Sequence, residues 1–153
     1  MPDMPADRAP GPLDAEAFRA IVEQAPEAII LADRDGTIRL WNRGAEALFG
    51  YGADEAIGRS LDLIIPEHLR RPHWEGFHRA IAAGRTRSAA GHVTTTRSMH
   101  KDGSKLYVDL SFTVVTGAAG TVIGALAIGR RAAPRQPAGT RADSPTSSSG
   151  ITQ

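Results

Sequence analysis

Apolar residues along this chain follow two different periods, which separate helical segments from strands. Residues 14–24 place Phe18, Ile21 and Val22 on one side of a helix, and Asp14 stands where its side chain can cap the first turn. Residues 105–115 instead alternate between apolar and polar side chains. The apolar positions of that segment are Leu106, Val108, Leu110, Phe112 and Val114. Such alternation predicts an antiparallel strand that is buried on one face.

Glycine and proline divide the rest of the chain into short elements. We expect further helices or helical turns over residues 43–49, 54–57 and 67–83, the last interrupted near Pro72. We expect further strands over residues 28–33, 38–41, 91–99 and 121–130. The order of one helix, two strands, several short helices and three strands predicts an α+β fold, with helices gathered on one face of an antiparallel sheet. A ligand pocket can lie between these two layers.

The composition limits the possible functions. The chain has 153 residues, of which 41% are apolar, a net charge of +1 and no cysteine. The near-neutral charge argues against a nucleic-acid surface, and the lack of cysteine excludes disulfides, thiolate metal sites and cysteine catalysis. No apolar run approaches the roughly 20 residues that span a bilayer, and no signal-peptide pattern begins the chain. We therefore expect a cytoplasmic protein that binds neither nucleic acid nor membranes.

Both ends of the chain differ in composition from its middle. Residues 1–13 hold four prolines, and residues 133–153 are rich in Ser, Thr, Gly and Pro. Such segments bury too little apolar surface to offset the entropy cost of ordering. We predict a flexible lead over residues 1–13, one folded domain over residues 14–132 and a disordered tail over residues 133–153.

Several short motifs lie at the ends of the expected elements and in the turns between them. They are Gln24-Ala25-Pro26-Glu27, Ala32-Asp33-Arg34-Asp35-Gly36-Thr37, Trp41-Asn42-Arg43-Gly44, Phe49-Gly50-Tyr51, Ile64-Ile65-Pro66 and Lys101-Asp102-Gly103-Ser104. With the element order, these motifs resemble the PAS sensor domain. The resemblance implies a PAS fold with a five-stranded antiparallel sheet, which senses a ligand or redox state and signals through dimer contacts. PAS domains are mostly not enzymes, and the chain shows no nucleophile elbow or phosphate loop, so we predict no catalytic activity.

Three occupants of a PAS pocket have to be compared. Flavin photoreceptors of this fold need a reactive cysteine, which this chain lacks, and no motif indicates non-covalent flavin. Resemblance to the haem-binding, oxygen- and redox-sensing branch implies that His73 binds the iron of haem b (iron protoporphyrin IX). It also implies that Arg79, six positions later, pairs with a haem propionate. The third possibility is a domain without a cofactor, in which His73 makes an ordinary polar contact; His73 taken alone favours it.

The same resemblance concerns the strand before the Lys-Asp-Gly turn. Counting back from Gly103, His92 stands where the direct oxygen sensors carry a methionine as sixth iron ligand. Thr94 stands where they carry the arginine that steadies bound oxygen, and threonine offers a weaker hydrogen bond. The matching positions of Arg79 and His92 therefore favour haem over a domain without a cofactor. We expect a six-coordinate haem whose iron is bound by His73 and His92. Such a haem senses redox state or a diatomic gas, namely O2, CO or NO.

Apolar residues that can line the pocket suit haem and other ligands equally. They are Phe77, Ile64, Leu110, Phe112, Ile123 and Leu126. Met99 is a reserve iron ligand, although alternation from His92 places it on the opposite face. We expect His68, His78 and His100 in solvent, Trp74 in the core or at a dimer contact, and Trp41 and Asn42 in structural roles.

The N-terminal helix is a candidate contact surface. Its stripe of Phe18, Ile21, Val22 and Ala25 can form a homodimer or pack on the domain's own sheet. No kinase, cyclase or DNA-binding segment is recognisable, which suggests an excised sensor or a separate output protein. The alternative function is a cofactor-free interaction and dimerisation module, or a non-covalent binder of small ligands.

Overall fold

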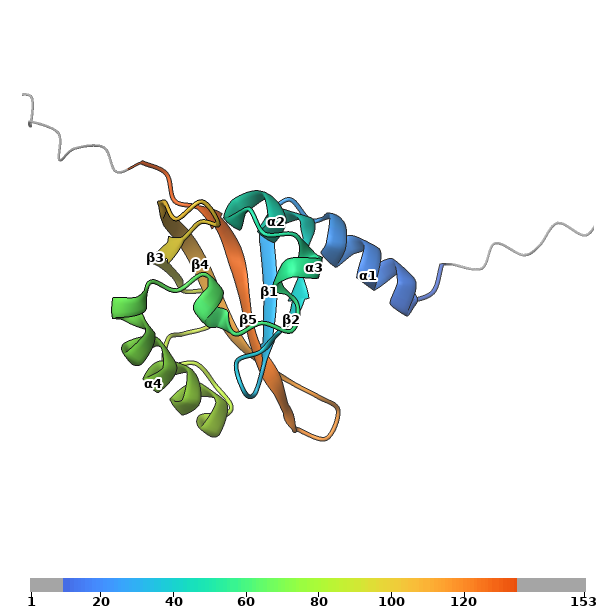
Figure 1. Ribbon diagram of the computed structural model, residues 1–153. Helices are drawn as coiled ribbons and strands as arrows, with labels where there is room; N and C mark the ends of the chain where they lie inside the picture. The colour runs from blue at the N-terminus through green and yellow to red at the C-terminus, as the bar shows by residue number, and fades with distance from the viewer. Residues whose placement is uncertain (1–9, 135–153) are drawn as a thin grey trace, which may run out of the picture.

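The computed structural model describes residues 10–134 and contains one antiparallel sheet of five strands. The strands are β1 (Ala28–Asp33), β2 (Ile38–Trp41), β3 (Val93–Met99), β4 (Lys105–Thr116) and β5 (Val122–Arg131). Their order in the sheet is β2-β1-β5-β4-β3, so the first hairpin joins the last three strands through β1 and β5 (Figure 1). The strands predicted from the sequence are confirmed, with β3 beginning at Val93 rather than at residue 91.

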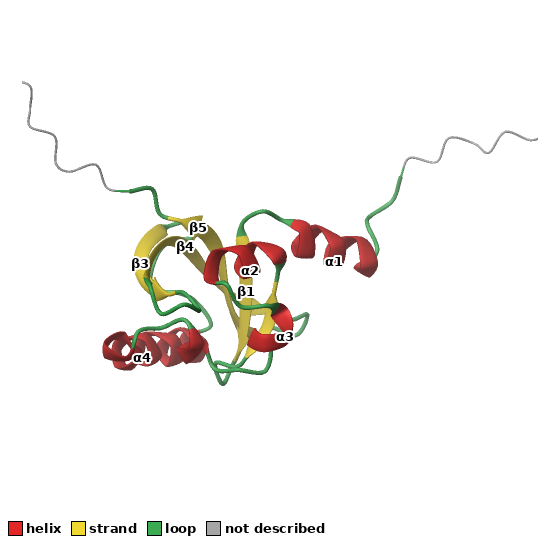
Figure 2. Cartoon of the chain, turned by 45° about the horizontal axis from the view of Figure 1, so that its top comes forward, coloured by secondary structure: helices red, strands yellow, loops and turns green. Residues whose placement is uncertain are grey.

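The helices also match the sequence pattern. They are α1 (Ala15–Gln24), α2 (Arg43–Phe49), α3 (Ala53–Ala56), the 3₁₀ turn η1 (Leu61–Leu63) and α4 (Glu67–Ala83). Figure 2 shows α2, α3 and α4 on one face of the sheet, with α4 set apart from the other two. The predicted interruption near Pro72 is wrong, because α4 continues through this residue. Proline lacks a backbone N–H and therefore removes one hydrogen bond from a helix. In α4 the turns on both sides of Pro72 are nevertheless helical.

Asn42 joins the N-terminal elements and is completely buried. Its Oδ1 accepts hydrogen bonds from the backbone N–H groups of Ile29 at 2.8 Å and Ala45 at 3.0 Å. Its Nδ2 donates to the carbonyls of Val22 and Glu27, each at 2.9 Å. One side chain thus fixes the end of α1, the start of β1 and the N-terminus of α2. This confirms the predicted helix cap and structural role of Asn42.

The core is divided unevenly beneath the helices. The larger part lies under α2 and α3, where Trp41 and Phe49 are buried with ring centroids 5.4 Å apart. The smaller part lies under α4 and consists of Ala32, Phe77 and Ile81. Most of the buried apolar surface therefore belongs to the α2 side, and the space between α4 and the sheet is incompletely filled by side chains.

Helix α1 does not cover the sheet. No residue of α1 is buried, and Phe18 and Ile21 are 56% and 55% exposed. Figures 1 and 2 show α1 extending beyond α2, away from α4. The apolar stripe is thus not packed on its own sheet. Most of the predicted lead and tail, residues 1–9 and 135–153, lies outside the described residues, and residues 10–13 and 132–134 have no regular secondary structure.

Candidate ligand site

A cavity of about 450 Å³ lies between α4 and the sheet. Residues from the η1 segment, α4 and all strands except β2 line it, and 13 of the 17 are apolar. The lining residues are Ile30, Ala32, Leu61, Ile64, Ile65, Leu69, Pro72, His73, Phe77, Thr96, Arg97, Ser98, Leu110, Phe112, Ala125, Leu126 and Ala127. Three consecutive residues of β5 take part, of which Ala125 and Ala127 pair with the cavity-lining Ala32 and Ile30 of β1.

A second cavity of about 290 Å³ adjoins the first. The two have five lining residues in common: Pro72, His73, Phe77, Phe112 and Ala125. The second cavity is more polar, since the segment after α4 contributes Thr86, Arg87, Ser88 and His92. An apolar interior and a polar mouth therefore meet at His73.

His73 lies on α4 and is half-buried. Burial lowers the pKa of its imidazole below the usual value, more than the nearby Asp62 carboxylate raises it, and the neighbouring His78 lowers it further. Its Nδ1 atom is buried and has no hydrogen-bond partner in residues 10–134. The ring lies against Trp74 and Phe77, with centroid distances of 4.8 Å and 6.0 Å. The result is a neutral imidazole beside a mostly apolar space.

The structure brings eight of the ten predicted site residues to these cavities. Ile64, Leu110 and Leu126 line the first, His92 and Thr94 line the second, and His73, Phe77 and Phe112 line both. His92 and Thr94 are themselves exposed, as expected for side chains at a mouth. The two histidines predicted as iron ligands therefore both line the second cavity.

Two predicted site residues lie elsewhere. Arg79 is exposed and lines neither cavity. Six residues along a helix turn a side chain by about 240° from His73, which accounts for its outward position. Ile123 is 47% exposed and lies at the start of β5, beside Gly117 in the turn that precedes this strand. Neither position supports the assigned contact with a ligand.

Arg97 was missed by the sequence reasoning. It lines the first cavity, and its Nε atom is buried without a hydrogen-bond partner among the described residues. Strand alternation gave no signal for it, because its register partner is the exposed Tyr107. No carboxylate in the described part of the chain lines either cavity, whereas Arg97 and Arg87 do.

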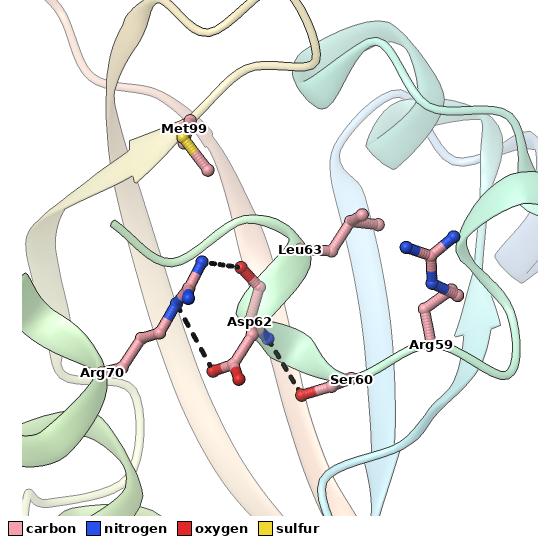
Figure 3. Close-up of a pocket in the computed structure, with 6 residues that line it drawn as sticks. All are labelled: Arg59, Ser60, Asp62, Leu63, Arg70 and Met99. Atoms are coloured by element: carbon pink, nitrogen blue, oxygen red, sulfur yellow. Dashed lines mark hydrogen bonds and ion pairs between the residues drawn. The ribbon is translucent and has the colours of Figure 1, made fainter. Parts of the chain in front are cut away.

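The remaining histidines and Met99 are placed mostly as predicted. His68 and His78 are exposed. His100 is not in solvent as expected: it is half-buried against Gly50, where an added Cβ would lie 2.6 Å from its ring. Met99 lines a separate groove of about 320 Å³ with Arg59 and Arg70 (Figure 3), and His73 is not among the lining residues of this groove.

Comparison with known proteins identifies the domain. A family model described as the PAS fold matches residues 16–132. The chain belongs to the PAS family. A PAS domain from Colwellia psychrerythraea has a TM-score of 0.65 and 26% identity, covering 78% of this chain and 98% of that one. An RNA-binding light-oxygen-voltage receptor has a TM-score of 0.60 and 21% identity over 80% of this chain and 36% of that chain, a likeness of fold alone.

Two of the curated relatives are named as sensor proteins. The PAS domain is 29% identical over 99 residues to the oxygen sensor protein DosP of Escherichia coli, and 40% identical over 56 residues to the sensor protein FixL of Bradyrhizobium diazoefficiens. These matches cover 65% and 37% of this chain but only 12% and 11% of the relatives. PAS domains are sensory and regulatory units of signalling proteins and are not typically catalytic.

Residues 10–134 contain neither a membrane-spanning helix nor a cluster of metal-binding side chains. The described helices include none with the length and apolar character needed to cross a membrane. Nor do those residues bring three or more His, Asp or Glu side chains together in a group that could hold a metal ion.

Proposed function

We propose that this PAS domain binds haem b beneath α4 through His73 and reports redox state or a diatomic gas to a signalling partner. The observation that carries the proposal is the place of His73 at the junction of two adjoining cavities, with a buried ring nitrogen that has no partner among the described residues and a pKa that burial lowers. Imidazole must be neutral to bind iron, and burial favours that form.

The residues present fit this cofactor. Pockets for small ligands and cofactors measure about 300 to 1,000 Å³ and are mostly apolar, with few polar groups. The first cavity has that volume and character, and the second extends it toward His92. Haem supplies an iron that changes oxidation state and binds small gases. His73 would hold the iron, while Ile64, Leu110 and Phe77 exclude water from its surroundings.

The mouth of the site favours redox or carbon monoxide sensing over stable oxygen binding. His92 and Thr94 line the same cavity as His73. A second imidazole competes with any gas for the iron, and the hydroxyl of Thr94 is a weak donor to bound oxygen. Arg87 lines the second cavity, and no carboxylate among the described residues does, which is compatible with an anionic group on the ligand.

Absorption spectra of the protein reconstituted with haem test the proposal. The wild type is expected to show a Soret band, and His73→Ala is expected to lose most of it. The matched control is His68→Ala, which removes an exposed histidine five positions earlier on the same helix. A His73→Ala protein that keeps the haem content and spectrum of the wild type would contradict the assignment.

The role of His92 has its own spectroscopic test. With both histidines on the iron, the wild type is low-spin and six-coordinate in both redox states. His92→Ala is expected to give a high-spin spectrum and faster carbon monoxide binding. If the wild type is already high-spin, or if His92→Ala leaves the spectrum unchanged, His92 is not an iron ligand and only lines the mouth of the cavity. The iron then has an open site for a gas.

The second candidate function is a cofactor-free interaction and dimerisation module. It is favoured by the exposed side chains of Phe18 and Ile21 on α1. Such an apolar stripe is typical of a contact surface. A Phe18→Ser, Ile21→Ser double variant is expected to convert a homodimer to a monomer in light scattering, whereas the exposed neighbour Arg19→Ser leaves it unchanged. A colourless wild type whose dimer depends on this stripe supports the module.

A further inference from the structure

His73 lacks the support that normally orients a metal-binding histidine. Such residues generally donate their second ring nitrogen to a carboxylate, carbonyl or water, which fixes the ring. In His73 neither ring nitrogen makes a hydrogen bond to another described residue, so whichever nitrogen takes the iron, no polar group of these residues orients the other. The ring is instead bounded by aromatic side chains, edge-on to Trp74 at an interplanar angle of 77° and tilted by 33° to Phe77. Packing must therefore set its orientation.

Trp74 is itself fixed on three sides. Its Nε1 donates a hydrogen bond of 2.8 Å to Oδ1 of Asp62. Its six-membered ring covers Gly36 in the turn between β1 and β2, so closely that an added Cβ there would overlap Cη2 and Cζ3. The exposed ring of His78 stacks on it with centroids 5.7 Å apart. An indole held in this way has little freedom to rotate.

The acceptor Asp62 is anchored in turn to the cavity wall. Arg70 forms an ion pair with the Asp62 carboxylate at 3.8 Å, and its Nη2 donates to the Asp62 carbonyl at 3.3 Å (Figure 3). The Nε of Arg70 also donates to the carbonyl of Ile65, a residue of the first cavity, at 3.1 Å. A continuous set of contacts thus runs from the cavity wall through Arg70 and Asp62 to Trp74.

We propose that Trp74, held by Asp62 and seated on Gly36, is the positioning residue for His73. Adjacent residues of a helix project about 100° apart, so Trp74 faces the β1–β2 turn while His73 faces the cavity. The anchor at Trp74 fixes the rotation of α4 about its axis, and that rotation determines where the imidazole points. The part of this inference that concerns iron rests on the proposed haem function.

Haem dissociation rates separate positioning from a structural role. Loss of a residue that orients a metal ligand typically weakens metal binding about 10-fold or more. Asp62→Ala and Trp74→Leu are expected to release haem about 10-fold faster, while Asp62→Asn, which keeps an acceptor for the indole, restores the slow rate. Glu75→Gln, an exposed neighbour of Trp74 on α4, is the matched control and should change nothing.

Two further measurements decide whether the effect passes through His73. Iron-free protoporphyrin IX has no bond to His73, so Asp62→Ala and Trp74→Leu should leave its affinity unchanged. In a His73→Ala background the same substitutions should no longer alter haem dissociation. Equal losses for both porphyrins, or a loss that persists without His73, overturn the positioning role and leave Trp74 as a packing residue.

A measurement on the protein without haem keeps this inference separate from the proposed function. In NMR spectra the His73 ring should show one set of sharp resonances shifted by the Trp74 ring, and Trp74→Leu should broaden them through exchange between rotamers. If the wild type binds no haem, the haem proposal fails and this spectrum still decides on positioning. Unchanged His73 resonances in Trp74→Leu overturn the inference.

Discussion

The two halves of the sheet's helical face are built differently. Under α2 and α3, Trp41 and Phe49 are fully packed and every side-chain polar atom of Asn42 is hydrogen-bonded. Under α4, the sheet faces a cavity, and His73 has a buried nitrogen without a partner in the described residues. Unpaired buried polar atoms destabilise a folded domain unless a ligand satisfies them. The comparison assigns stability to the α2 half and binding to the α4 half.

Truncation of one phenylalanine in each half gives the largest expected difference. Phe49→Ala should lower the free energy of unfolding by about 4 kcal/mol, because it opens a void in a close-packed core. Phe77→Ala should cost about 2 kcal/mol, since Phe77 already borders an open cavity and loses chiefly its own transfer energy. Urea denaturation measures both. Equal losses would show that the halves are packed alike.

Asn42→Ala is expected to lower the free energy of unfolding by about 3 kcal/mol, because it leaves buried backbone groups of three elements without partners. Haem affinity of the folded variant should not change, since Asn42 touches neither cavity. Thr95→Ala removes an exposed hydrogen bond to Asp109 and is the control, with a loss under about 0.5 kcal/mol. An Asn42→Ala protein as stable as this control would show that the cap is unimportant.

The same substitution of alanine by valine should have different effects in the two halves. Ala45→Val places two methyl groups in a fully buried site and should destabilise the fold by about 1 to 2 kcal/mol. Ala125→Val, on the cavity wall, should leave stability within about 0.5 kcal/mol and weaken haem uptake. Parallel denaturation and haem titration measure the two effects. Strong destabilisation by Ala125→Val would mean that the cavity has no room for a ligand.

The smallest expected effect is on the pH dependence of stability. Burial lowers the pKa of His73 in the folded state below its unfolded value. The unfolded chain then binds a proton more readily, so stability is lost as the pH falls from about 6.5 through the folded pKa. His73→Gln should flatten the dependence of the unfolding free energy on pH in this acidic window, whereas His68→Gln, a change at an exposed histidine of α4, should not. A curve that keeps its acidic slope in His73→Gln would assign the slope to other groups.

Local patterns in the sequence were enough for the elements and for most of the site. Alternation placed Leu110 toward the cavity, and the capping role of Asn42 followed from its position before a short helix. The resemblance placed His73 and His92 at one space. The pairing of β1 with β5 was not predictable, because no local signal encodes the order of strands. Arg79 was expected at the ligand because only its distance from His73 along the helix was considered, and not the direction of its side chain around the helix axis. No pattern in the sequence indicated that Arg97 lines a cavity.

Amide hydrogen exchange with and without haem tests most directly whether the ligand binds in the α4 half. The account predicts that haem slows exchange in α4, in the segment of residues 84–92 and in β3, while amides around Asn42 and in α2 exchange as before. Protection that appears first in α1 or α2, or haem that binds without any protection of α4, would contradict it.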